Sequence, residues 1–274
     1  MRGRAFGIAI AVLLSGCAQA AYFIRDTPVP MSALEVRMDP YERRSCLIVF
    51  MPGMLDTPDS FIDNGFVEDA VAASRRCDLA LADGHFGYYR TGQIRQRVTQ
   101  DILRIAEARG YEEFWIVGIS MGGMGTLLVA QENASRIRGV VLLAPFLGDD
   151  ALVRSIEEAG GLAEWHAPED ADPYDDDEYD DAMWGWLTGY ATHPEDMPEL
   201  YFATGADDAR AGLSLLAPHT PAQRSGTTPG GHGWSTWRVL WQRLLASPPW
   251  DPAPGRPPTL RGADGPISGA SDAS

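Results

Sequence analysis

The sequence has no segment in which basic residues cluster, and its 22 basic residues are outnumbered by 38 acidic ones, for a formal net charge of −16. Nucleic-acid phosphates are bound by grouped Lys and Arg side chains, so this balance argues against a nucleic-acid partner. Beyond the N-terminal stretch, no apolar run approaches the roughly 20 residues that a membrane-spanning helix requires. No internal repeat is apparent either.

What the sequence does contain is the composition of an ordinary folded protein, with 274 residues of which 45% are hydrophobic and 22% are charged. This is enough apolar material to enclose a substantial core, so the chain as a whole is not expected to be disordered. A single α/β unit commonly reaches roughly 200–250 residues. We therefore expect one domain that carries an insertion.

The N-terminus has the features of an export signal. A short basic start precedes an apolar stretch at residues 5–14, which is too short to span a bilayer but is typical of a signal peptide. The stretch ends in Leu-Ser-Gly-Cys at residues 14–17, which resembles the bacterial lipoprotein cleavage box. That resemblance implies that residues 1–16 are removed and that lipidated Cys17 anchors the chain to a membrane of the bacterial cell envelope. The alternative is an ordinary secretory signal, which also places the domain outside the cytoplasm.

Cysteine is scarce, with three residues in all. Lipidation of Cys17 leaves Cys46 and Cys77 as an even pair in a compartment that permits disulfides. Each stands at the start of an apolar run of the β type, so a disulfide could join the two strands if they are neighbours. Two inert buried thiols are the alternative.

From residue 47 onward, short apolar runs alternate with longer amphipathic stretches. This alternation predicts an α/β fold with a mostly parallel sheet and helices on both faces. The runs at 114–119 and 138–144 are nearly continuous, as expected of central strands that are buried on both sides. The expected strands cover residues 47–51, 78–82, 114–119, 138–144, 199–204 and 222–225, and the expected helices cover residues 59–73, 91–109, 121–133 and 232–246.

Two segments depart from this alternation. Residues 148–197 lack a strand pattern and hold many acidic residues and three tryptophans, so we interpret them as a small lid insertion over the sheet edge. Their acidic stretch at 172–178 lacks the glycine turn and the ligand spacing of a calcium loop, so no metal is expected there. Residues 247–274 are rich in Pro, Gly, Ser and Ala, which predicts a disordered tail. The domain is then expected at 45–246, after an anchor linker and N-terminal segment at 17–44.

The strongest local signal is a Gly-x-Ser-x-Gly motif at residues 118–122, directly after an expected strand and directly before an expected helix. Glycine tolerates the close backbone approach in such a tight strand-to-helix turn, and the turn presents the hydroxyl of Ser120 at a helix N-terminus. Negative charge that develops there is stabilised by the helix dipole. This context favours Ser120 as a nucleophile.

A serine hydroxyl needs a base that accepts its proton. Among five histidines, His232 stands in a Gly-rich loop after the last expected strand and before the last helix, which is the chain position that such a base requires. His85 follows the end of a strand and could line a pocket, but a structural role fits it at least as well. We expect His232 to be the general base.

A serine nucleophile and its histidine base usually work with an acid as the third residue of a catalytic triad. This acid should follow a strand between the serine and the histidine. Residues 201–208 end in Gly-Ala-Asp-Asp, and here the pattern resembles the α/β-hydrolase superfamily. That resemblance implies an acid three residues after the glycine, which selects Asp208, with Asp207 second. Asp149 and Asp150 are weaker options, because some members take the acid from the preceding strand.

The resemblance also implies two backbone donors for the oxyanion of the tetrahedral intermediate. One is the amide of Met121, and the other lies in the loop after strand 47–51, with the amide of Met54 favoured over that of Leu55. Members of the superfamily usually carry His-Gly where this chain has Pro-Gly. An apolar pocket is suggested by the side chains of Met54, Met121 and Met124 and by the tryptophans of the lid. These side chains could equally pack in the core.

The resemblance covers residues 45–246 and implies an α/β-hydrolase fold and a serine hydrolase that needs no metal or organic cofactor. We expect a carboxylic ester of small-molecule size as substrate, cleaved through an acyl-enzyme intermediate. The same triad could serve a thioesterase, an amidase or an acyltransferase. A non-catalytic envelope binding protein is the alternative from another class. The substrate's chain length and the oligomeric state do not follow from the sequence.

Overall fold

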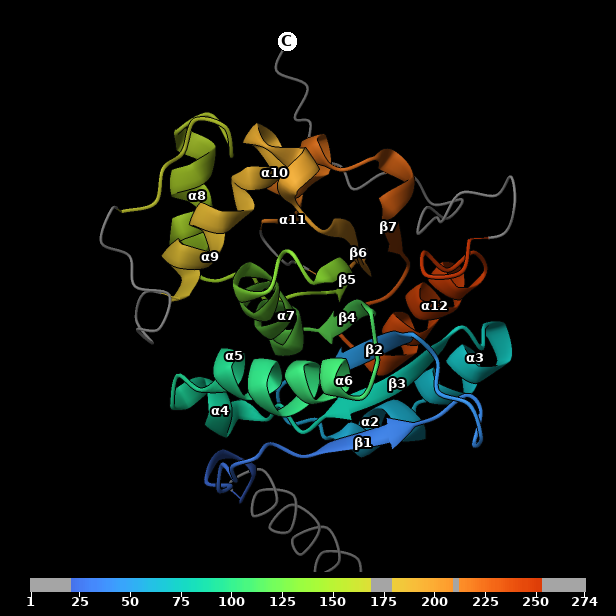
Figure 1. Cartoon of the computed structure of the whole chain (residues 1–274). Helices are drawn as coiled ribbons and strands as arrows, with labels where there is room; N and C mark the ends of the chain where they lie inside the picture. Colours follow the sequence, from blue (N-terminus) through green and yellow to red (C-terminus); the bar gives the residue numbers. More distant parts are fainter. Residues whose placement is uncertain (1–20, 169–178, 209–211, 253–274) are drawn as a thin grey trace, which may run out of the picture.

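The computed structural model describes residues 21–168, 179–208 and 212–252. Within these residues one seven-stranded sheet runs through the molecule in the order β1-β3-β2-β4-β5-β6-β7 (Figure 1). The pairing of β1 with β3 is antiparallel, and the other pairings are parallel. The strands are β1 (Ala33–Val36), β2 (Cys46–Met51), β3 (Cys77–Ala82), β4 (Glu113–Ile119), β5 (Ile137–Leu143), β6 (Glu199–Gly205) and β7 (Ser225–Thr228). The sheet is therefore mostly parallel, as predicted.

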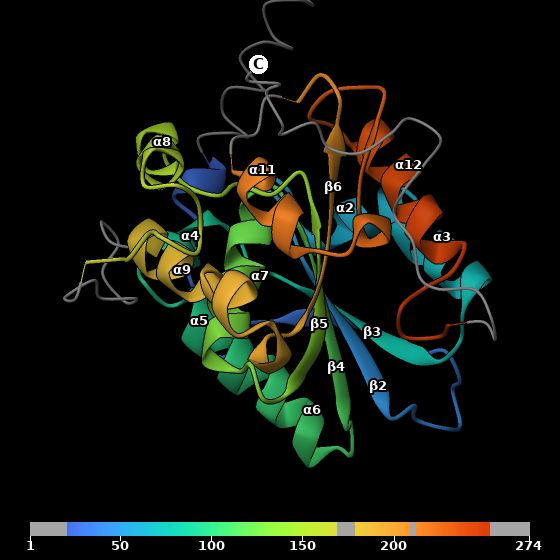
Figure 2. The same ribbon diagram turned by 90° about the horizontal axis from the view of Figure 1, so that it is seen from above.

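Helices cover both faces of this sheet, as the view from above shows (Figure 2). One face carries α2, α3 and α12, and the other carries the helices from α4 to α11. They are α2 (Pro58–Asp63), α3 (Phe66–Ala73), α4 (Phe86–Arg90), α5 (Ile94–Arg97), α6 (Arg104–Ala108), α7 (Met121–Glu132), α8 (Asp150–Glu158), α9 (Tyr179–Leu187), α10 (Gly189–Thr192), α11 (Leu213–Leu216) and α12 (Trp234–Leu245). A π-helical segment (Val98–Leu103) joins α5 to α6, and single 3₁₀ turns occur at Pro194–Asp196, Ala217–His219 and Ala222–Arg224.

The core is built by the strands that were expected to be central. Every residue of β2 and β3 is buried, as are nearly all residues of β4, β5 and β6. Strands covered by helices on both faces have no polar side, so their sequences read as continuous apolar runs. The side chains above and below the sheet form two separate clusters, one under each layer of helices.

Some boundaries differ from the expected ones. The last strand was expected at 222–225 but begins only at Ser225, because residues Ala222–Arg224 form a 3₁₀ turn. The helix expected at 59–73 is two helices, separated where Gly65 adopts a left-handed φ of 76°. The short helix α4 and the edge strand β1 were not expected, and β1 makes part of the 17–44 segment a member of the sheet.

The expected lid insertion holds α8, α9 and α10. Residues 169–178 within it, which include the whole acidic stretch at 172–178, lie outside the described residues. Trp184 is buried in the core, and its indole donates a hydrogen bond to the carbonyl of Leu147 at 2.8 Å. Trp165 and Trp186 are partly buried and pack against the same cluster. The tryptophans of this segment therefore stabilise its attachment to the sheet.

The end of the domain also lies later than expected. The ordered chain continues past Ala246, because Trp250 is buried between Trp115 and Trp241, with ring centroids 5.8 and 5.7 Å away. The prediction of disorder from residue 247 is therefore wrong for residues 247–252, where an aromatic side chain finds a place in the core. Residues 253–274 lie outside the described residues.

Cys46 and Cys77 form a disulfide in the structure. The two residues face each other in the parallel register of β2 and β3, with Cα atoms 4.4 Å apart. The bridge therefore ties together the starting ends of two central strands. None of the helices in the described part of the chain is both long and apolar enough to cross a membrane.

Candidate active site

The turn at Ser120 is strained and tightly held. Ser120 joins β4 to α7 with a φ of 52°, a value that non-glycine residues rarely adopt. Its amide donates to the carbonyl of Leu143 at 3.1 Å, which ties the turn to β5. Strain of this kind persists only where the surroundings fix it, and it is concentrated at functional sites.

The glycines of the motif allow two segments to pass almost in contact. A Cβ on Gly122 would lie 2.1 Å from the carbonyl oxygen of Met51, and a Cβ on Gly118 would lie 2.3 Å from the carbonyl oxygen of Gly122. Both distances are far below van der Waals contact. Glycine is therefore required at both positions, because helix α7 starts directly against the end of β2.

Ser120, His232 and Asp208 form a continuous hydrogen-bonded chain. The Oγ of Ser120 lies 2.9 Å from Nε2 of His232, and Nδ1 of His232 lies 2.6 Å from Oδ2 of Asp208. An ionised carboxylate can only accept, so Nδ1 carries the proton and Nε2 is left to accept from the serine hydroxyl. The imidazole is thus held in the tautomer that can take a proton from Ser120.

Backbone contacts fix the two loops that carry His232 and Asp208. The amides of Ala206 and Asp207 donate to the carbonyls of Thr228 and Gly230, at 2.8 and 3.0 Å. The loops come so close that a Cβ on Gly205 would lie 2.1 Å from the carbonyl oxygen of Gly230.

The two adjacent acids face different surroundings. The side chain of Asp208 is only 3% exposed, whereas Asp207 is exposed to solvent. The structure therefore brings Asp208, and not Asp207, to the histidine.

The remaining acids and the second histidine have other positions. Asp149 caps α8, where its side chain accepts from the amide of Ala151 at 2.6 Å, and Asp150 is the first residue of that helix. His85 is fully buried and caps α4, accepting from the amide of Gly87 at 3.1 Å. None of these side chains joins the chain of hydrogen bonds at Ser120.

The peptide that would supply the first oxyanion donor is oriented by its own carbonyl. The carbonyl of Ser120 accepts from the amides of Gly123 and Phe146, each at 2.9 Å, so the peptide plane that carries the Met121 N–H cannot rotate freely. Met121 is also the first residue of α7, where amides have no partner within the helix.

The expected second donor belongs to the loop after β2. A Cβ on Gly53 would lie 3.5 Å from the Cβ of Ser120, so the chain that continues into Met54 passes directly beside the serine. The amide of the alternative donor, Leu55, is already engaged by the hydroxyl of Tyr22. Burial raises the pKa of Tyr22, and the hydrogen bonds from backbone amides, including that of Leu55, oppose this rise. This contact favours Met54 over Leu55.

A pocket of about 610 Å³ opens above Ser120 and His232. Its walls are mostly apolar, and the methionines expected there are among the lining residues. The lining residues are Met54, Phe86, Tyr89, Ser120, Met121, Met124, Phe146, His232 and Trp237. No tryptophan of the expected lid contributes to it. Sites of this size and character bind small molecules with apolar groups.

Several pocket residues were not expected from the sequence. The ring of Trp237 meets the imidazole of His232 edge to face, with centroids 4.9 Å apart, and so limits the movement of that ring. Tyr89 closes the floor, where its hydroxyl donates to the carbonyl of Met121 at 3.2 Å, and burial raises its pKa. Only chain position could have indicated two of these residues as part of the pocket. Trp237 lies one turn into α12, and Phe146 comes just after β5.

Asp56 adds a carboxylate beside the histidine loop. Burial raises the pKa of Asp56, and hydrogen bonds from Trp234 and Ser60 oppose that rise. Among the described residues, no group of three or more His, Cys, Asp or Glu side chains is arranged to hold a metal ion.

Comparison with known proteins agrees with the fold. A family model described as alpha/beta hydrolase fold matches residues 47–184, which is half of the chain. A search among curated proteins finds no match. Solved structures are similar in fold, at sequence identities too low to show more than the fold.

Three of these structures illustrate the likeness. The fluorophosphonate-binding serine hydrolase F of Staphylococcus aureus is 11% identical, with a TM-score of 0.54, covering 79% of this chain and 98% of that chain. The S-formylglutathione hydrolase of the same organism is 13% identical, with a TM-score of 0.52 and coverages of 81% and 98%. Est1E of Butyrivibrio proteoclasticus with ferulic acid is 14% identical, with a TM-score of 0.52 and coverages of 78% and 92%. With its family model, its sheet and its strand-to-helix turn in agreement, the chain belongs to the α/β-hydrolase family.

Proposed function

We propose that this protein is a serine hydrolase that cleaves a carboxylic ester through an acyl-enzyme intermediate on Ser120. The observation that carries the proposal is the hydrogen-bonded chain from Ser120 through His232 to Asp208 at the floor of an apolar pocket. This arrangement supplies a nucleophile, a base in the correct tautomer and a buried acid that stabilises the imidazolium. The apolar walls favour a neutral substrate with a hydrocarbon or aromatic group.

In the first half of the reaction, Nε2 of His232 takes the proton of Ser120 as Oγ attacks the carbonyl carbon of the ester. The carbonyl oxygen becomes an oxyanion, which accepts hydrogen bonds from the amides of Met121 and Met54. The intermediate then collapses, and the alkoxide leaves with the proton from His232. Removal of one such donor has cost about 3–4 kcal/mol of transition-state stabilisation in another serine hydrolase.

In the second half, water replaces the alcohol. The side chain of His232 is 26% exposed, so water can reach Nε2 once the alcohol has left. His232 removes a proton from this water, the hydroxide attacks the acyl carbonyl, and Ser120 leaves with the proton from His232.

We further propose that Cys17 carries a lipid anchor in the bacterial cell envelope. Residues 1–20, which include Cys17 and the stretch interpreted as an export signal, lie outside the described residues. The disulfide between Cys46 and Cys77 supports a location outside the cytoplasm, because such bridges form in oxidising compartments. Replacement of Cys17 with Ser should move the protein from the membrane fraction to the soluble fraction.

Fluorophosphonate labelling of the purified protein tests the catalytic proposal. We expect labelling of the wild type and none of Ser120→Ala, with strongly reduced labelling of His232→Ala. A series of p-nitrophenyl esters from acetate to palmitate, together with a thioester and an amide, then defines the preferred bond and acyl length. A folded wild-type protein that reacts with neither the probe nor any ester would contradict the proposal and favour a binding protein.

A further inference from the structure

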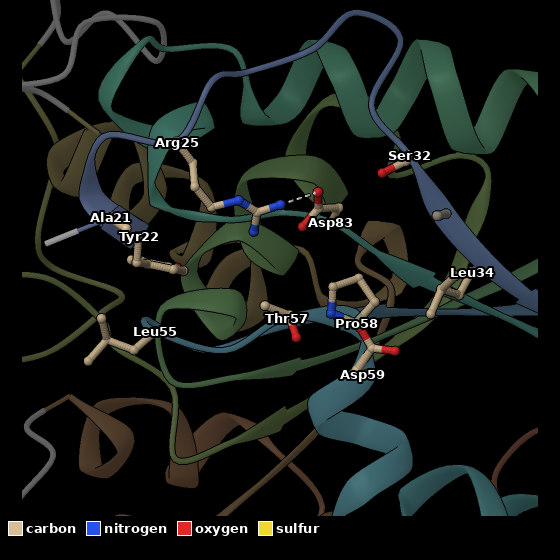
Figure 3. A pocket seen from close by; sticks show the side chains of 11 residues that line it. Ala21, Tyr22, Arg25, Ser32, Leu34, Leu55, Thr57, Pro58, Asp59 and Asp83 are labelled. Atoms are coloured by element: carbon tan, nitrogen blue, oxygen red, sulfur yellow. Dashed lines mark hydrogen bonds and ion pairs between the residues drawn. The ribbon is translucent and has the colours of Figure 1, made fainter. Parts of the chain in front are cut away.

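A second hollow lies beside the pocket of Ser120. It has a volume of about 640 Å³ and lies between the N-terminal segment, the loop after β2 and the end of β3 (Figure 3). Figure 3 shows Ala21, Tyr22 and Leu55 together at one end of it. Met54, the neighbour of Leu55, lines the Ser120 pocket. The same short loop therefore borders both hollows.

Large apolar side chains are exposed around this loop. We call five of them the apolar rim: Phe23, Ile24, Met54, Leu55 and Phe146, which are 36, 76, 45, 45 and 38% exposed. Contacts place three of them at the pocket, because Met54 and Phe146 line it directly and the ring of Phe23 lies 5.3 Å from that of Phe86, another lining residue. Leu55 and Ile24 follow Met54 and Phe23 directly in the chain. Exposed apolar groups gathered in one place mark a surface that binds another apolar surface.

Charge near the rim does not suit an anionic partner. Arg25, the cation nearest to Ile24 in the sequence, pairs with Asp83 at 2.9 Å, as the dashed line in Figure 3 shows. The chain as a whole has a formal net charge of −16. A surface of this kind would associate through hydrocarbon contact, and electrostatic attraction to acidic headgroups would contribute little.

The proposed lipid anchor lies close to the rim along the chain. Cys17 is four residues before Ala21, which lines the second hollow. Four residues span at most about 14 Å even when fully extended. A lipid attached at Cys17 would therefore hold the bilayer near the end of the hollow that Ala21 and Leu55 line.

From the exposed rim, its contacts and this short tether, we infer that the apolar rim rests on the membrane surface and that the Ser120 pocket opens toward the lipid. The inference deepens the proposed function and rests on its acyl-Ser120 chemistry and its lipid anchor. It assigns the substrate to a class: neutral, poorly water-soluble esters whose acyl chain enters the pocket from the bilayer. Hydrolysis would release the alcohol and a fatty or aromatic acid at the membrane surface.

Fluorescence quenching in vesicles tests where the rim lies. The full chain, expressed with its own export signal and extracted from membranes, is reconstituted into phosphatidylcholine vesicles that contain brominated lipid. Environment-sensitive labels are placed on Ile24→Cys and Leu55→Cys, and on Ile105→Cys as the control. Ile105 is 39% exposed, similar to Leu55, but it lies in α6, which leads to the starting end of β4.

We expect brominated lipid to quench the labels at positions 24 and 55 at least about threefold more than the label at 105, because only buried labels meet the acyl chains. Equal quenching at all three positions in vesicle-bound protein would overturn the inference. Failure of the wild-type chain to float with vesicles would overturn both the anchor and the docking of the rim. Hydrolysis of p-nitrophenyl butyrate by that same sample would show separately that the proposed chemistry stands.

A second variant tests the substrate class. We expect Ile24→Asp to lower hydrolysis of p-nitrophenyl palmitate embedded in vesicles by about tenfold, since a charged side chain cannot replace the isoleucine that would be inserted among the lipid acyl chains. Hydrolysis of water-soluble p-nitrophenyl acetate should not change, and Ile105→Asp should affect neither substrate. An equal loss on both substrates would place the effect of position 24 in the fold and would contradict a membrane role.

Discussion

The indole of Trp234 donates a hydrogen bond to the carboxylate of Asp56 at 3.1 Å, across 178 residues of sequence. Asp56 closes the turn that carries Met54, because its amide donates to the carbonyl of Gly53 at 3.2 Å. Trp234 begins α12, two residues after His232. One bond therefore connects the loop of an expected oxyanion donor with the loop of the expected base.

Replacement of Trp234 with Phe should remove this bond while keeping an aromatic ring against its neighbours Phe61 and Phe66. We expect kcat/KM for p-nitrophenyl butyrate to fall about tenfold, because a small displacement of either loop misplaces a reacting group. The control is Trp241→Phe, further along α12, where the indole donates a similar hydrogen bond to the carbonyl of Phe66 in α3. Because Trp241 is fully buried, the smaller ring also leaves a cavity, so this variant should lower the free energy of unfolding by about 2 kcal/mol or more and leave kcat/KM unchanged. Equal kinetic losses in the two variants would contradict this account.

The two adjacent acids should differ sharply in their effect on catalysis. Replacement of Asp208 with Asn should lower kcat by about 10³-fold or more, because the amide no longer stabilises the imidazolium and favours the wrong tautomer of His232. Replacement of the exposed Asp207 with Asn should change kcat less than about twofold, since surface changes away from the site are usually small. Steady-state kinetics of both variants test this, and an inactive Asp207→Asn with an active Asp208→Asn would reverse the assignment.

The sequence allowed Ser120, His232 and Asp208 to be proposed as site residues because each lies in a recognisable local pattern. Ser120 lies between two glycines at a change from strand to helix, and His232 lies in a Gly-rich loop before the last helix. Asp208 follows a strand that ends in Gly205, and the resemblance to the α/β-hydrolase superfamily selected it ahead of Asp207. At Ser120 and at Gly205 the pattern arises from backbone crowding at the ends of parallel strands, which restricts the residue types there.

Features that depend on distant contacts could not be predicted in this way. The Asp56–Trp234 bond joins positions with no common pattern, and the tryptophans at 148–197 gave no indication of which way they point. Trp184 is buried against Leu147, whereas the pocket is closed by Trp237 from another helix. The edge strand β1 was missed because its four residues alternate too briefly to be distinguished from a loop.

Gly122 should not accept even a methyl group. A Cβ there would lie 2.1 Å from the carbonyl oxygen of Met51, which belongs to a central strand and cannot move aside easily. We expect Gly122→Ala to lower the free energy of unfolding by about 3 kcal/mol or more, as severe overpacking does. Gly233→Ala is the control, because nothing lies within 4 Å of its Cβ position and its backbone is extended. Urea denaturation of both proteins should show the difference, and a stable Gly122→Ala would contradict the contact.

Loss of the disulfide should affect stability and spare catalysis. Cys46 and Cys77 are 31 residues apart, and the bridge joins the starting ends of strands whose other ends lead to the pocket. A loop of that length predicts that Cys46→Ser/Cys77→Ser loses about 3–4 kcal/mol of unfolding free energy by the chain-entropy model. Urea denaturation measures this loss, and kcat/KM of the folded variant should match that of the wild type. A large fall in kcat/KM would indicate that the bridge positions the site.

His85 should make stability depend on pH. It is fully buried, and its Nδ1 must be unprotonated to accept from the amide of Gly87 at 3.1 Å. Burial lowers the pKa of His85 most strongly, the charge of Arg25 lowers it further, and Asp83 opposes them. The unfolded chain, with a histidine pKa of about 6.5, therefore takes up a proton before the folded chain does.

It follows that the contribution of His85 is fully present above about pH 6.5 and is lost as the pH falls from there toward the lower folded value. The replacement His85→Asn keeps a side chain that caps helices but does not titrate. We expect the fall in unfolding free energy between about pH 7.5 and 5.5 to be smaller in this variant than in the wild type. The exposed His166, replaced by Asn, is the control and should leave the wild-type slope unchanged. A histidine that is buried in the neutral form must make the folded state less stable as the pH falls. Identical slopes in His85→Asn and the wild type would therefore contradict this role of His85 and show that the acid sensitivity arises from other residues.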